Sequence, residues 1–431
     1  MRIELANNAT YVKQLGIVII IAKVIYSIIL FCAEIPFLAN LFVDKDIVNF
    51  ALVKCNNLST MLSLLTSCLI IININNCVQR LNHLIIILQF LLLIGIICII
   101  LPQNFNKQLI LNNYIPIINS LIFIFGLSCF IVAVILFHII TINICNITSI
   151  TLTLIILTAC ISFICSYYSL QTILTKYQID LLFFYNTIFW SSGNIIYVFF
   201  TQTLMVAWLY LIQSLLHIRS NSKITFIYNI LILLNTVVAI SGLLGHVIYN
   251  MESPYFKQFY IHYTQYFISI PAIIFALTML YQIFTIKIYK SIYNYDSIVL
   301  PNRSWQQTML LSQDIVYHGL LSSIMFFLTI NITNLLTKSV ITYYELAAGI
   351  SLIFMTISYN ITCNKYLINN KFAILQLWLY CISYLLNLID YLDLNLVKII
   401  SKVVFYMITI FTQLWFIIII YSARVNKLSS S

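Results

Sequence analysis

The chain has 431 residues, of which 62% are hydrophobic and only 7% are charged. Ordinary soluble domains contain about a quarter charged residues, so this composition excludes that class and predicts an integral membrane protein. Only eight Gly and six Pro are available for turns, which favours a helical bundle because helices satisfy their own backbone hydrogen bonds in lipid.

Apolar stretches of about 20 residues or more, the length that a bilayer core requires, recur along the whole sequence. They predict an all-α polytopic protein with twelve transmembrane helices in one membrane domain, residues 15–421. The segment 1–14 and the tail 422–431 lie outside this domain. The predicted spans are 15–37, 51–74, 81–101, 113–138, 147–170, 188–212, 224–249, 259–284, 309–332, 341–361, 372–392 and 397–421.

Basic residues are divided unevenly between alternate loops, and short cytoplasmic loops are enriched in Lys and Arg. With the N-terminus inside, twelve of the 21 basic residues fall on the cytoplasmic side, six on the other side and three within spans. We therefore expect a multi-pass protein of the cell (inner) membrane with both termini cytoplasmic. The net charge of +10 is then an orientation signal and does not indicate nucleic-acid binding.

Span six contains two segments that resemble a known family. It reads Phe-Trp-Ser-Ser-Gly-Asn over residues 189–194 and Met-Val-Ala-Trp-Leu over residues 205–209. This pattern resembles the sixth helix of haem-copper oxidase subunit I (cytochrome c oxidase subunit I-like proteins), where Phe-Trp-Gly-Gly-Gly-His precedes an Ala-Trp. The resemblance implies that Asn194 stands where that family has a copper-ligating histidine.

Spans ten and two extend the resemblance to the haem-ligand positions. Span ten reads Thr-Tyr-Tyr-Glu over residues 342–345 and resembles the family's tenth helix, where His-Tyr-His-Gly supplies a ligand to each haem. Thr342 and Tyr344 therefore take the places of those two histidines. In span two, Cys-Asn-Asn-Leu-Ser is similar to a His-Val-Asp-Leu-Ser stretch, so Cys55 takes the place of the second ligand to the low-spin haem.

Span seven ends in Ser-Gly-Leu-Leu-Gly-His over residues 241–246. Where the family has two adjacent copper-ligating histidines, this chain has Leu244 and Gly245, and His246 comes one residue late. The predicted topology places all of these positions within about two helical turns of the outer surface, at 1.5 Å rise per residue. They would thus share the layer in which the family holds its haems and copper.

The resemblance therefore implies a fold that has lost its chemistry. Oxygen reduction needs a haem iron facing a copper held by imidazoles, and Asn, Leu and Gly are poor replacements. We expect neither haem nor copper and no oxygen-reductase activity. We also expect the vacated haem region to have collapsed around large side chains such as Tyr343, Tyr344 and Phe354. If activity survived, it would be that of an oxidoreductase.

The expected role of such a pseudoenzyme is structural or assembly-related, in contact with the lipid bilayer and with other membrane subunits. One alternative is a residual haem held by Cys55 and Tyr344, since thiolate and phenolate ligate haem iron elsewhere. A polytopic transporter is another alternative, although no repeat of one half of the chain in the other is visible. A membrane hydrolase is disfavoured because no Ser/His or paired-carboxylate arrangement is visible.

Ionisable residues within spans usually face a bundle interior or a water-filled cavity. His246 and His318 are the two histidines that lie away from span ends or beside the altered copper positions. Asp314 precedes His318 by four residues on the same helix face, which fits a proton relay and a structural hydrogen bond equally. Glu345 could form an ion pair with Lys54 across the haem region, or both could reach the outer interface.

Overall fold

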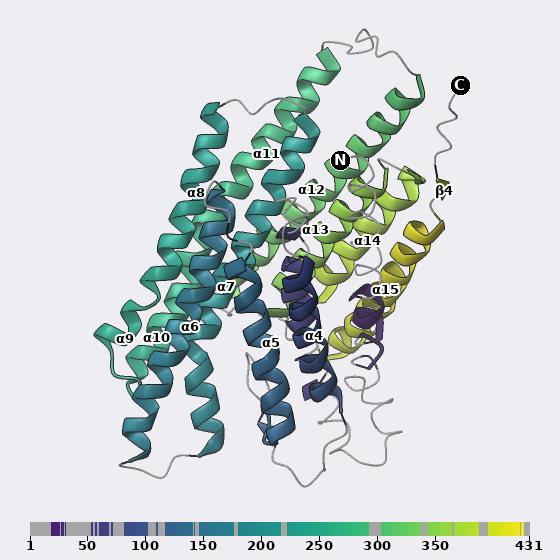
Figure 1. Ribbon diagram of the computed structural model, residues 1–431. Helices are drawn as coiled ribbons and strands as arrows, with labels where there is room; N and C mark the ends of the chain where they lie inside the picture. The colour runs from purple at the N-terminus through teal and green to yellow at the C-terminus, as the bar shows by residue number, and fades with distance from the viewer. Residues whose placement is uncertain are drawn as a thin grey trace.

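A computed structural model shows a bundle of long helices (Figure 1). The described residues also form two short antiparallel strand pairs. The structure describes residues 19–25, 27–29, 31, 53–54, 57, 60–68, 70–71, 82–101, 109–110, 117–140, 142, 146–175, 180–216, 222–292, 303–337, 343–363, 366–387, 395–422 and 424–425.

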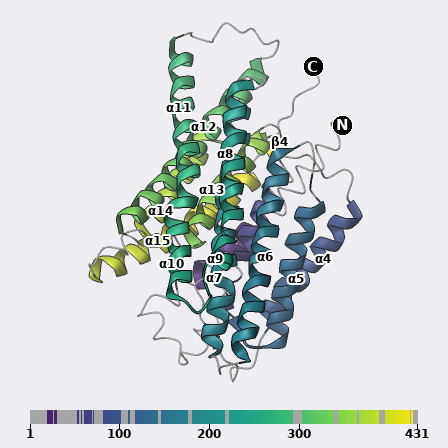
Figure 2. The ribbon, with the colours of Figure 1, turned by 90° about the vertical axis from the view of Figure 1, so that its left-hand side faces the viewer.

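The main helices lie side by side, and α11 and α12 extend beyond the others at one end of the bundle (Figures 1 and 2). The strand pairs are β1 (Leu109–Ile110) with β2 (Ile117–Ile118), and β3 (Tyr366–Leu367) with β4 (Arg424–Val425). In chain order, the helices are α4 (Asn82–Ile100), α5 (Leu121–Ile140), α6 (Ile147–Leu174), α7 (Leu181–Leu216), α8 (Ser222–Ser241), α9 (Leu244–Ile248), α10 (Pro254–His262), the π-helix η2 (Tyr263–Ile268), α11 (Ser269–Ile292), α12 (Arg303–Thr337), α13 (Tyr343–Cys363), α14 (Asn370–Asn387) and α15 (Asn395–Ser422).

The prediction of an all-α polytopic membrane protein is confirmed. Within the described residues, eight helical segments are long and apolar enough to cross a membrane. The total of twelve spans and the oxidase-like arrangement stay predictions. The eight segments are Leu121–Ile139, Ile147–Leu174, Leu181–Leu215, Thr225–Ile248, Pro254–Thr285, Asp314–Thr333, Leu346–Cys363 and Ile400–Ser422.

Span four starts later than the sequence indicated. We predicted residues 113–138, whereas α5 begins at Leu121, after the β1–β2 pair. Ser120 explains this start, because its hydroxyl accepts a hydrogen bond from the backbone N–H of Phe123 at 3.2 Å. Such an N-cap satisfies an N–H group that has no partner within the helix.

Spans seven and eight are both interrupted. The predicted span 224–249 divides into α8 and α9 at a turn that contains Gly242. In span eight, the π-helix η2 separates α10 from α11. Pro271 follows η2 closely in α11, and a proline cannot donate the usual hydrogen bond to the carbonyl four residues earlier. The residue at that earlier position is Phe267, within η2, so Pro271 accounts for the irregular turn.

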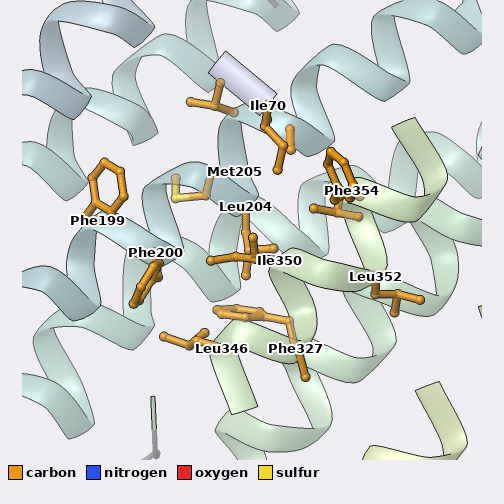
Figure 3. Close-up of a cluster of buried hydrophobic side chains, with 14 of the residues drawn as sticks. Ile70, Phe199, Phe200, Leu204, Met205, Phe327, Leu346, Ile350, Leu352 and Phe354 are labelled. Carbon is orange, nitrogen blue, oxygen red and sulfur yellow. The ribbon is translucent and has the colours of Figure 1, made fainter. Parts of the chain in front are cut away.

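Helix α7 is the centre of the bundle, since 89% of its most apolar stretch is buried. Figure 3 shows how its side chains meet those of neighbouring helices. Phe354 of α13 is fully buried, as predicted, while the side chains of Tyr343 and Tyr344 lie outside the described part. The labelled cluster comprises Phe199, Phe200, Leu204 and Met205 of α7, Phe327 of α12, Leu346, Ile350, Leu352 and Phe354 of α13, and Ile70.

Glycines bring two helix pairs into close contact. A Cβ added at Gly126 of α5 would lie 2.9 Å from the carbonyl oxygen of Gly95 of α4 and 2.6 Å from the Cβ of Cys98. One added at Gly319 of α12 would lie 2.3 Å from Oγ1 of Thr356 of α13. Small residues stabilise membrane helix pairs in this way, because lipid is as apolar as the helices and dispersion contacts drive association.

Candidate functional site

A histidine and three serines form a hydrogen-bonded cluster where α9 meets α6 and α7. The Nε2 atom of His246 lies 3.0 Å from Oγ of Ser162 and 3.1 Å from Oγ of Ser191. Ser191 also pairs with Ser166, with 2.8 Å between the two hydroxyl oxygens. The three serines are completely buried, so the cluster joins α9 to α6 and α7 inside the bundle.

These serines differ from most buried hydroxyl residues of the bundle, which donate to a carbonyl of their own helix, as Thr203 does to Phe199. Among the described hydrogen bonds, those of Ser162, Ser166 and Ser191 run only to side chains. The other ring nitrogen of His246, Nδ1, is buried without a partner among the described residues. A buried polar atom without a hydrogen-bond partner destabilises a fold by about 1–3 kcal/mol. Among the described residues, Nδ1 is the atom of this cluster whose hydrogen bond is missing.

Sequence reasoning missed this Ser/His arrangement because Ser162 and His246 are 84 residues apart. A nucleophilic serine must be reachable by its substrate, and the hydroxyls of Ser162 and Ser191 belong to fully enclosed residues. The geometry therefore fits a structural connection that holds α9 in place. It does not provide an accessible hydrolase site.

Two tyrosines of the following span fix the turn between α8 and α9. Tyr260 of α10 donates to the carbonyl of Gly242 at 2.7 Å, and Tyr263 of η2 donates to the carbonyl of Val238 at 2.8 Å. A Cβ added at Gly245 would lie 2.9 Å from two side-chain atoms of Tyr260. Position 245 therefore accepts only glycine unless the tyrosine moves and gives up its hydrogen bond.

The three positions predicted from the copper site do not offer a set of ligands. Leu244 is 49% exposed, and Gly245 packs against Tyr260. Asn194 is buried, and its amide donates to the carbonyl of Trp190 in its own helix. Their segments do meet, because Ser191, one turn of α7 before Asn194, contacts His246.

Of the predicted haem-ligand positions, the structure describes only the backbone of Tyr344. Cys55 and Thr342 lie outside the described residues. Tyr344 and Glu345 belong to the first turn of α13, but their side chains lie outside the described part. The Glu345–Lys54 ion pair stays a prediction, and the amine of Lys54 donates to the carbonyl of Leu101 at 2.8 Å.

Asp314 and His318 have different surroundings. Asp314 is exposed on α12, whereas the Nδ1 atom of His318 accepts a hydrogen bond from the indole of Trp378 of α14 at 3.4 Å. In the part of the chain that the structure describes, no three or more His, Cys, Asp or Glu side chains gather as a metal site would require.

Two further buried polar contacts escaped sequence reasoning. Lys23, which is 6% exposed, donates to the hydroxyl of Ser351 of α13. In the middle of α7, Gln202 donates to Thr151 of α6 at 3.2 Å and accepts from Asn235 of α8 at 2.7 Å. A polar residue among apolar neighbours was the available signal, but its partner could not be read from spacing along the chain.

Comparison with curated proteins finds an uncharacterized protein of Rickettsia prowazekii (strain Madrid E) that is 28% identical over 305 residues. The match covers 63% of this chain and 59% of the relative, so the chain spans well under two thirds of the relative's length. No family model matches the chain, and no solved structure matches it. The chain is thus a multi-pass helical membrane protein with an uncharacterized relative.

Proposed function

We propose that this chain is a non-redox membrane protein with a haem-copper oxidase subunit I-like bundle, and that it serves as a structural or assembly subunit of a membrane complex. The proposal rests on the segments of spans six and seven that resemble that family. Their positions no longer offer the chemistry that the resemblance would imply. What remains is a packed helical body suited to contacts with lipid and with other membrane subunits.

The lack of room for a side chain at Gly245 is the observation that carries the proposal. A histidine at this position would need its Cβ 2.9 Å from Tyr260, closer than non-bonded carbon atoms approach. Tyr260 cannot turn away freely, because its hydroxyl is bonded to the carbonyl of Gly242. With Leu244 half-exposed, the two adjacent ligand positions cannot both face one metal.

Packing between the central helices supports the same conclusion. Ile350 of α13 lies beside Leu204 of α7, and the buried side chains of Phe354 and Met205 belong to the same apolar cluster (Figure 3). Such tight packing stabilises a membrane bundle without a cofactor, because dispersion contacts accumulate over many atoms. A structural subunit requires only this stable body and its lipid-facing surface.

Spectroscopy of the purified protein tests the loss of redox chemistry. We expect the reduced-minus-oxidised absorption spectrum in detergent to show no haem bands, and elemental analysis to find iron and copper well below one atom per chain. Stoichiometric haem would refute the proposal and would favour ligation by Cys55 and Tyr344.

A genetic experiment tests the structural role. Deleting the gene for this chain in its native cell should remove one membrane complex from native gels or lower its apparent mass. Expressing the wild-type chain should restore the complex. Asn194→Ala should restore it equally well, because no ligand chemistry is required at that position. Unchanged complexes after deletion would contradict an assembly role even if the protein holds no haem.

A further inference from the structure

A cavity of about 300 Å³ lies between the second span and helices α5, α6 and α7. Its wall is almost entirely apolar and includes Met61, Phe130, Ile156 and Ala159. Along α6 the lining extends from Ile156 to position 164, about 12 Å at 1.5 Å per residue. The volume falls at the lower end of the roughly 300–1,000 Å³ range of ligand pockets.

Water is a poor occupant of this cavity. A buried water needs two to four polar partners, whereas the wall is almost entirely apolar and two of its few polar side chains are engaged within their own helices. The amide of Asn57 donates to the carbonyl of Val53 at 2.9 Å, and the hydroxyl of Ser192 is directed to the carbonyl of Phe189 at 3.5 Å. An apolar occupant gains dispersion contacts that an empty cavity would lack.

The mouth of the cavity lies on the membrane-facing side of the bundle. Ile131 of α5 and Ile164 of α6 line the cavity and are 37% and 51% exposed. Both belong to helices that are apolar and long enough to cross a membrane. A ligand that enters between them comes from the hydrocarbon interior of the bilayer and not from water.

We propose that this cavity is a lipid-binding site that holds one acyl chain of a membrane phospholipid, inserted sideways between α5 and α6. The site is elongated, apolar and open to lipid, which matches a hydrocarbon chain. Phospholipid is the hydrocarbon source that surrounds the mouth. The inserted chain would fill the contact between the second span and α7 and so stabilise this side of the bundle.

Photocrosslinking tests the site with the full-length chain in vesicles of phosphatidylethanolamine and phosphatidylglycerol. The probe is phosphatidylcholine that carries a diazirine in one acyl chain, and adducts are assigned by tandem mass spectrometry. We expect adducts on Met61 and Ile156, which are 2% and 5% exposed, so that only an inserted chain can reach them. Ile161, which is 49% exposed on the same helix, reports ordinary surrounding lipid.

A cavity-filling variant provides the decisive comparison. Ala159→Phe should abolish the adducts on Met61 and Ile156 and leave those on Ile161. Leu154→Phe, at an exposed position of α6, is the matched control and should change none of them. If Ala159→Phe does not fold, Ile131→Trp at the mouth replaces it, with the same expected loss.

Three results would overturn the inference. The first is labelling confined to Ile161 in the wild-type protein, and the second is labelling of Met61 that Ala159→Phe does not reduce. The third concerns the identity of the bound molecule. We expect mass spectrometry of the purified protein to find about one retained phospholipid per chain, because a cavity of this size holds a single small ligand. A retained polyisoprenoid in its place would refute the assignment to a phospholipid.

Discussion

The contact between Gly319 of α12 and Thr356 of α13 allows a sharp test of the bundle. Gly319→Ala adds one Cβ, which would lie 2.3 Å from Oγ1, 2.4 Å from Cγ2 and 2.9 Å from Cβ of the threonine. The threonine side chain cannot rotate freely, because its hydroxyl donates to the carbonyl of Leu352 at 3.0 Å. Both helices must therefore move apart.

The size of the effect follows from this overlap. Inserting a methyl group into a packed interior destabilises a protein by about 1–3 kcal/mol, and we expect the upper half of that range because all three contacts are shorter than 3.0 Å. The greater helix propensity of alanine offsets this by about 1 kcal/mol. Gly319→Ala should therefore lower the free energy of unfolding by roughly 1–2 kcal/mol.

Gly349 of α13 is the matched control. A Cβ at this position would lie 3.5 Å from Leu204 and at least 3.6 Å from Phe326, which is ordinary van der Waals contact. Gly349→Ala should therefore leave the thermal unfolding temperature in detergent unchanged or raise it, while Gly319→Ala lowers it. Adding Thr356→Ala to Gly319→Ala should recover part of the loss, as expected for residues in direct contact.

Equal unfolding temperatures for Gly319→Ala and the wild type would refute this account of the α12–α13 contact. A double variant whose loss equals the sum of the two single losses would also refute it, because steric overlap predicts coupling between the positions.

Three other predictions address different parts of the bundle. Gly126→Leu should separate α4 from α5, because even its Cβ would lie 2.6 Å from the Cβ of a facing cysteine; size-exclusion chromatography should show less folded protein, and an unchanged profile would contradict the contact. Gln202→Leu should lower the free energy of unfolding by about 1–3 kcal/mol, because it leaves the amide of Asn235 without its acceptor. Adding Asn235→Leu should recover part of this loss in thermal unfolding, and a larger loss in the double variant would count against the explanation. Gly245→Ala should lower the unfolding temperature more than Asn194→Ala does, because the first creates a clash and the second removes a hydrogen bond within one helix; the reverse order would show that position 245 tolerates a side chain.

The candidate site illustrates how far sequence reasoning reached. The sequence singled out Asn194 and His246 and placed them in one layer, because span order and helical rise fix depth in the membrane. The structure brings their segments into contact through Ser191. It also shows that the partner of His246 is Ser162, and no local pattern relates two residues in different spans.

The sequence by itself determined the class of the protein and the approximate position of each described helix. Both follow from local properties, since hydropathy over about 20 residues decides membrane insertion and a helix satisfies its own backbone. The start of α5 and the interruption of span eight also follow from local chemistry, at Ser120 and Pro271, but the predicted spans did not include them.

Only the tertiary structure decided which face of each helix meets which neighbour. A soluble helix reveals its buried face through an apolar stripe, but in lipid both faces are apolar. Phe125 of α5 is 58% exposed while Phe123, two residues earlier, is fully buried, and the two look alike in sequence. Helix rotation therefore depends on shape, such as the close approach at Gly319, and on rare polar pairs such as Lys23 with Ser351. These contacts form only when the whole bundle assembles.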